Sequence, residues 1–187
     1  MKSQKITPWL IVLALLVAAC FSIVPAANAG DTSSRGSAEV TDLLAQVKSK
    51  AATLEKDTEH LAQWTLARQV SWQSHTAQVN LIRGHINEAG KLLTRLNETR
   101  STASPWQHEA MDRIRPLLQE LADNTTTLID HLNDSRNNVH LSDYRDSAKA
   151  GADTAKELAA LVRDYVEYGE HEAEFRRLQD KLTSATS

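Results

Sequence analysis

From residue 37 almost to the end of the chain, apolar residues recur at alternating intervals of three and four positions. In an α-helix this spacing places the apolar side chains on one face and leaves Lys, Glu, Gln and Arg on the others, so the pattern predicts amphipathic helices. The first two rows of apolar residues are Val40, Leu43, Leu44, Val47, Ala51, Leu54, Leu61 and Trp64, followed by Trp72, Val79, Ile82, Ile86, Ala89, Leu93 and Leu96.

A third helix is predicted to start at Ser104, which is followed by Pro105 and Gln107. A serine cap, a proline in the first helical position and a glutamine three residues after the cap are a typical helix start. Pro116 removes one backbone hydrogen bond inside this helix, so we expect a kink near Asp112. The apolar row of this helix is Met111, Ile114, Leu118, Leu121, Thr125, Leu128 and Leu132, and it reaches Val139 if the helix continues that far.

A fourth helix is predicted after a turn at residues 137–141, with Ser142 or Asp143 as its N-cap. The first half of its row is rich in small residues, which allows a neighbouring helix to approach closely. Beyond Gly169 only the 3.5-residue period of a coiled coil keeps the last two members of the row in line. The row is Tyr144, Ala148, Gly151, Ala155, Leu158, Val162, Tyr165, Gly169, Phe175 and Leu182.

Helix length decides between two all-α architectures. A single helix over residues 37–100 would be roughly 95 Å long, whereas the third and fourth helices would be near 50 and 60 Å. A break at residues 68–71, with Ser71 as a cap, removes this mismatch and predicts an antiparallel four-helix bundle. The alternative is a long first helix with a three-helix bundle. Such a chain would dimerise through the free row from Val40 to Leu61.

The first 29 residues resemble an export signal. Lys2 and Lys5 precede an apolar run over residues 9–24, and a small-x-small pattern ends at Ala29. The sequence therefore predicts a signal peptide at 1–29 that is cleaved after Ala29, a flexible segment at 30–36, and a helical bundle domain at 37–187. Cys20 lies in a lipoprotein-like context, so lipidation there and an uncleaved anchor are the alternatives to soluble export.

Charge and cysteine content exclude several classes of function. Removal of the leader, which carries two lysines and no acid, changes the net charge from −3 to −5. Nucleic-acid or anionic-membrane binding would call for clustered positive charge, so neither partner is expected. We expect membrane attachment only through a lipid on Cys20 or an uncleaved leader. Because Cys20 is the only cysteine, the processed chain would hold no disulfide and no cysteine metal ligand.

Histidines are the main candidates for a binding site. His75 falls on the apolar face of its helix, and His131 lies at the border of the next row, near Asn124 and Thr125. A buried layer of these side chains could bind a cation, which makes His75 and His131 candidate metal ligands. The alternative is a hydrogen-bonded polar layer that fixes helix register, and we favour it.

Cofactor and catalytic signatures are missing from the sequence. It holds no Cys-x-x-Cys-His, Glu-x-x-His or His-Glu-x-x-His motif, so no cofactor is expected. Ser71 and His75 are one helical turn apart, but no acid is placed to orient the imidazole, and no glycine-rich turn exposes a nucleophile. The acidic residues around His171 (Glu167, Glu170 and Glu174) are interpreted as a solvated face.

These observations predict an exported, non-enzymatic helical-bundle protein in the periplasm or outside the cell. It would act through contacts with a protein, which includes a second copy of itself. The row from Val40 to Leu61 and the acidic last helix are the candidate contact surfaces. The alternative function is a bundle that binds a metal or a small ligand through His75 and His131.

Overall fold

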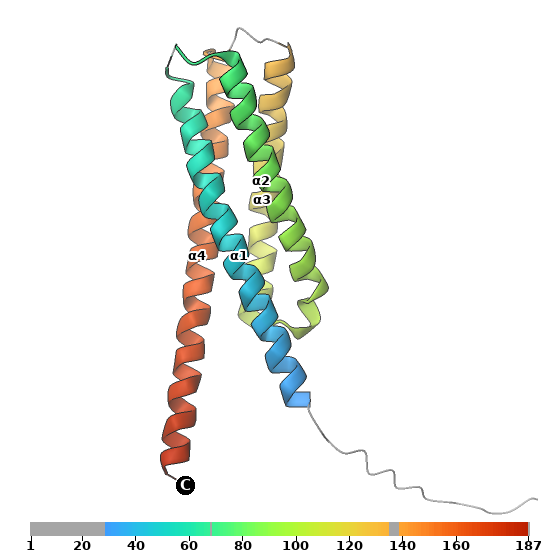
Figure 1. The fold of residues 1–187 in the computed structure, drawn as a ribbon, viewed down its shortest axis with the longest axis vertical. Coiled ribbons are helices and arrows are strands. Elements are labelled where there is room, and N and C mark those ends of the chain that lie inside the picture. The colour runs from blue at the N-terminus through green and yellow to red at the C-terminus, as the bar shows by residue number, and fades with distance from the viewer. Residues whose placement is uncertain (1–28, 68, 135–138, 187) are drawn as a thin grey trace, which may run out of the picture.

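The computed structural model describes residues 29–67, 69–134 and 139–186. Its helices are α1 (Ala29–Trp64), α2 (Trp72–Glu98), the short 3-10 helix η1 (Arg100–Thr102), α3 (Pro105–Asp134) and α4 (Ser142–Ala185). The four long helices run alternately up and down, and α4 returns to pack against α1 (Figure 1). Each long helix therefore packs mainly against two neighbours. The predicted all-α helical bundle is confirmed.

The first two apolar rows belong to separate helices. α1 ends at Trp64, and α2 begins after Ser71, whose hydroxyl accepts a hydrogen bond from the Ser74 backbone N–H at 3.2 Å. The Ser71 cap marks the start of a new helix at a point where the sequence has neither glycine nor proline to end the previous one. The alternative of one long helix over residues 37–100 is therefore wrong. The row from Val40 to Leu61 lies in the bundle core, so it is not a free contact surface either.

Two predicted helix starts are shifted. α1 begins at Ala29, so residues 30–36 are helical, whereas we expected a flexible segment before a helix start at 37. Extending a helix that has already formed costs little, even through residues of low helix propensity. α4 begins at Ser142 with Leu141 as its N-cap, because the Ser142 hydroxyl donates to the Asp143 carboxylate instead of capping the helix.

Other predictions fall outside the described residues. The apolar run at 9–24, Cys20 and all of the leader except Ala29 belong to this part of the chain, as do residues 137 and 138 of the predicted turn. In the part of the chain that the structure describes, no helix combines the length and the apolar character that a membrane span requires.

α3 starts as predicted but uses only half of the capping box. It begins at Pro105, and the Gln107 side-chain oxygen accepts a hydrogen bond from the Ser104 backbone N–H at 2.8 Å. The Ser104 hydroxyl is buried and has no partner among the described residues. The helix then continues through Pro116 to its last residue.

α4 changes its surroundings at Gly169. Before this residue its small side chains, among them Ala148, Gly151 and Ala155, are buried against neighbouring helices. At Gly169 the ring of Trp106 occupies the space that a side chain would need. A Cβ built at Gly169 would lie only 2.6 Å from the Trp106 Cη2 atom. We call residues 170–185 the α4 extension. It projects beyond the other helices, and all its side chains except that of Glu172 are exposed (Figure 1).

Candidate functional site

His75 is the centre of an aromatic and polar cluster at one end of the bundle. It lies in the first turn of α2 and is 0 % exposed. Its Nδ1 atom lies 3.2 Å from the hydroxyl of Tyr144, which comes from the first turn of α4. The ring centroids of Trp64 and His140 lie 6.0 and 6.3 Å from that of His75. The predicted inward orientation of His75 is therefore confirmed.

The predicted polar layer forms only in part. His131 and His75 both contact Tyr144, with their ring centroids 6.3 and 5.4 Å from that of the tyrosine. Thr125 does not join them, because its hydroxyl donates to the Leu121 carbonyl of its own helix at 2.8 Å. Asn124 lies beside Gly151, farther along the bundle. Tyr144, which the sequence analysis placed only in an apolar row, is the residue that joins the two histidines.

Burial keeps His75 and Tyr144 uncharged at neutral pH. It lowers the pKa of His75 to about 4, and the positive charge of a protonated His140 adds to this effect. Burial also raises the pKa of Tyr144 well above its usual value. At neutral pH the 3.2 Å contact therefore joins a neutral imidazole to a neutral phenol. The second ring nitrogen of His75 is buried and has no hydrogen-bond partner among the described residues.

The surroundings of His75 do not form a recognisable metal site. Within residues 29–67, 69–134 and 139–186, no group of three or more His, Cys, Asp or Glu side chains is placed to hold a metal ion. The contacts of His75 and His131 are aromatic rings and one phenol hydroxyl. This geometry favours the polar layer that fixes helix register over the metal hypothesis.

Ser71 and His75 do not form a nucleophile and base pair. The Ser71 hydroxyl bonds to the Ser74 backbone N–H and lies 3.1 Å from the Ser74 hydroxyl. The His75 imidazole points to Tyr144 instead. Both side chains are therefore engaged in capping and packing.

At the opposite end of the bundle, Gln107 has a role that the sequence analysis missed. It is 0 % exposed, and its Nε2 atom donates to the Ser37 carbonyl and to the Thr41 hydroxyl, both at 3.0 Å. Because its side-chain oxygen also caps α3, this one residue ties the start of α3 to α1. A helix-start motif shows the cap but carries no signal for the contact across the bundle.

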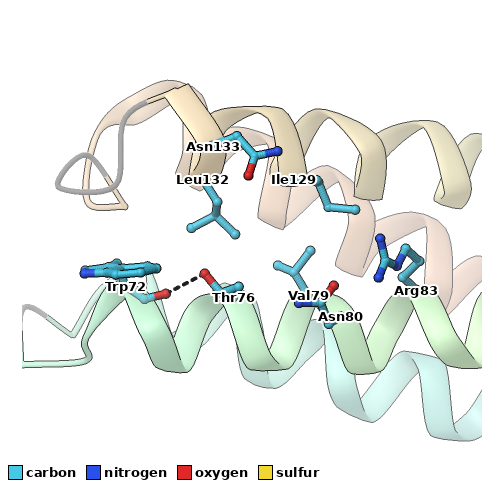
Figure 2. A pocket seen from close by; sticks show the side chains of 8 residues that line it. All are labelled: Trp72, Thr76, Val79, Asn80, Arg83, Ile129, Leu132 and Asn133. Carbon is cyan, nitrogen blue, oxygen red and sulfur yellow. Dashed lines mark hydrogen bonds between the residues drawn. The ribbon is translucent and has the colours of Figure 1, made fainter.

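A groove between α2 and α3 contains a hollow, and Figure 2 shows the side chains that line it. It has a volume of about 330 Å³, and Val79, Ile129 and Leu132 form its apolar wall. Arg83 lies at its rim among asparagine and threonine side chains. A second, shallower hollow of about 630 Å³ lies farther along the same two helices and is lined by Lys91 and Arg115.

The charges along this groove have one sign. Arg83, Lys91 and Arg115 are the only charged residues that line the two hollows, although acids outnumber bases in the whole chain. Arg83 and Lys91 form no ion pair with any described residue. An apolar wall with cations at the rim suits a ligand that has an apolar body and one anionic group.

The α4 extension presents the other candidate surface. Its apolar residues Phe175, Leu178 and Leu182 are 62, 47 and 70 % exposed. Its charges pair along the helix, Arg176 with Glu172 and Arg177 with Glu174. The acidic residues around His171 are exposed, in agreement with their interpretation as a solvated face.

Comparisons of the chain with protein-family models, with curated proteins and with solved structures found no match.

Proposed function

We propose that this chain is an exported, non-enzymatic helical-bundle protein that acts through protein contacts made by the α4 extension. The observation that carries the proposal is the row of exposed apolar side chains at Phe175, Leu178 and Leu182. The leader motif that ends at Ala29 supports the export part. The buried, uncharged His75 and its contact with the Tyr144 hydroxyl support a structural role for this residue over a catalytic one.

The row of exposed apolar side chains on the α4 extension differs from the rest of the described surface. Seven large apolar residues are exposed among the described residues, and four of them, Tyr168 included, lie on the last part of α4. The other three, Leu66, Leu81 and Leu141, lie singly elsewhere, as is normal on soluble proteins. A contiguous apolar patch with charged residues beside it is instead typical of an interaction surface.

A photo-reactive amino acid at position 175 tests the contact. In cells that express the full chain, illumination should link position 175 to a protein partner. The matched control is the same amino acid at Ala173, which is exposed on the opposite side of the extension. Equal adducts at both positions, or none at 175, would show that the apolar row contacts no protein.

Intact-mass measurement of the accumulated protein tests export. Loss of the first 29 residues is the expected result, and a lipid mass on Cys20 would indicate an anchored protein instead. A full-length chain retained inside the cell would contradict the proposal.

A second candidate function is the binding of a small anionic amphiphile in the groove between α2 and α3. The observation that favours it is the set of Arg83, Lys91 and Arg115 around an apolar wall. Dodecanoate should then change the fluorescence of Trp72, which lines the deeper hollow, more strongly than dodecanol does.

Matched variants test this second candidate. Arg83→Gln should weaken the binding of dodecanoate, while Arg163→Gln, on the exposed surface of α4, should not. Equal responses to the acid and the alcohol would exclude recognition of the anionic group.

A further inference from the structure

We propose, building on the function proposed above, that the partner of the α4 extension is the same segment of a second copy of this chain. The two segments pair antiparallel, with Phe175 of each copy facing Leu178 of the other. The exposed row, the charges that flank it and the symmetry of the pairing support this arrangement.

The exposed row has the spacing of a coiled coil. Tyr168, Phe175 and Leu182 are seven residues apart, and His171, Leu178 and Ala185 follow each of them by three. A strict alternation of three and four gives the narrow stripe that two helices share, whereas a helix buried in a bundle carries a wider apolar face. The extension therefore fits one partner helix.

The flanking charges select the direction and register. Glu174 and Lys181 lie on one flank of the stripe, and Glu172 and Gln179 lie on the other. In an antiparallel pair equal flanks meet, so the register that places Phe175 against Leu178 also places Glu174 against Lys181. By two-fold symmetry this attractive pair occurs twice in each dimer.

Other arrangements lose these pairs. A shift of one heptad brings Glu174 against Glu174 or Lys181 against Lys181, and like charges oppose the contact. A parallel pair brings opposite flanks together, so that Glu174 meets Gln179 and no ion pair forms. Among the registers that keep the apolar stripe continuous, only the proposed one brings opposite charges together without also bringing like charges together.

The contact between the two copies begins where the bundle core ends. The Trp106 ring packs against Tyr168, with 5.8 Å between the ring centroids, and against Gly169. Beyond this point the described residues leave the row exposed, and the second copy covers it. Two short helical segments form a small interface, so we expect a dimer that dissociates on dilution.

Sedimentation velocity over a range of concentrations tests the pairing. The sample is the protein that accumulates in cells expressing the full chain, with its intact mass recorded. Leu178→Glu puts a carboxylate into both central layers of the dimer, so we expect at least tenfold weaker dimerisation. Ala173→Glu adds the same charge on the outward side and should leave dimerisation unchanged. Circular dichroism checks that both variants stay helical.

Two results would overturn the pairing. The first is a wild-type protein that sediments as a monomer at every concentration. The second is an equal effect of Leu178→Glu and Ala173→Glu.

Charge exchange tests the direction. Glu174→Lys turns two attractive pairs into repulsive ones and should weaken the dimer about tenfold. Glu174→Lys combined with Lys181→Glu should restore it. Glu172→Lys is the matched control, because it also loses an arginine partner on its own helix but meets Gln179 of the second copy. A dimer insensitive to Glu174→Lys would exclude the antiparallel register.

The two proposals fail separately. A photo-adduct at position 175 with a different protein, together with a monomeric wild type, would contradict self-pairing but support the proposed function. An adduct of twice the chain mass would support both.

Discussion

α4 is one continuous helix in two different surroundings. Before Gly169 it presents small residues such as Ala148, Gly151 and Ala155 to closely packed neighbours. After Gly169 it carries Phe175 and Leu182, which are large and exposed. Small residues therefore let the first part approach its own bundle closely, whereas the large apolar side chains of the second part stay exposed. Apolar periodicity therefore serves folding in the first part of this helix, and we propose that it serves recognition in the second.

The strongest way to test this contrast is to truncate the same residue type in both parts. Leu158→Ala removes a side chain that is 1 % exposed in the buried part of α4, so it should lower the free energy of unfolding by about 2–5 kcal/mol. Leu182→Ala, at 70 % exposure in the extension, should change it by less than about 0.5 kcal/mol. Urea unfolding of dilute protein measures both values.

A large loss from Leu182→Ala in dilute protein would show that the extension belongs to the folded core of a single chain. The two parts of α4 would then not differ in the way proposed.

Acid should destabilise the bundle through His75. An unfolded histidine titrates near 6.5, whereas burial lowers the pKa of His75 to about 4 in the fold. The unfolded chain therefore binds protons first as the pH falls. Stability should decline from about pH 6.5 to about pH 4, by up to about 3 kcal/mol, and this contribution should then level off. Thermal or urea unfolding across this range measures the decline.

His75→Gln keeps a polar side chain beside Tyr144 and removes the titration, so the decline over this pH window should be smaller in this variant. His171→Gln, in the exposed extension, is the control and should leave the decline of dilute protein as in the wild type. An unchanged decline in His75→Gln would show that another group causes it.

Substitution of glycines tests the boundary at Gly169. A Cβ at this position would meet the Trp106 ring at 2.6 Å, so Gly169→Ala should destabilise the bundle by about 1–3 kcal/mol. Gly84 is also helical but has nothing within 4 Å of a built Cβ, so Gly84→Ala should stabilise it by about 0.5–1 kcal/mol. Urea unfolding of both variants should give opposite signs. Equal signs would mean that helix propensity outweighs the contact with Trp106.

Much of the fold could be predicted from periodicity alone. The apolar rows identified α2 and α3 as separate helices, because side chains three and four apart share a helix face. The predicted start of α1 was wrong, because local composition does not show how far a formed helix extends. The predicted N-cap of α4 was also wrong. The Ser142 hydroxyl donates to the Asp143 carboxylate and does not cap the helix.

The candidate sites were harder to predict because they depend on contacts between helices. The row around His75 indicated that it points inward, but nothing local indicated that Tyr144, 69 positions later, would meet it. The link from Gln107 to Ser37 spans 70 positions and left no signal either. The groove beside Arg83 requires two helices in a known register. The exposed row from Phe175 to Leu182 was visible, but only the fold shows that it lies beyond the core.

The smallest expected effect concerns the extension itself. Phe175→Ala should change the free energy of unfolding of dilute protein by less than about 0.5 kcal/mol, because the side chain is 62 % exposed. Amide hydrogen exchange is the sensitive measurement, since it detects local opening that global unfolding misses. In dilute wild-type protein the amides of residues 170–185 should exchange faster than those of residues 148–162. At high concentration a paired extension should gain protection, and Phe175→Ala should lose that gain. Protection that is independent of concentration would mean that the extension is held by its own chain.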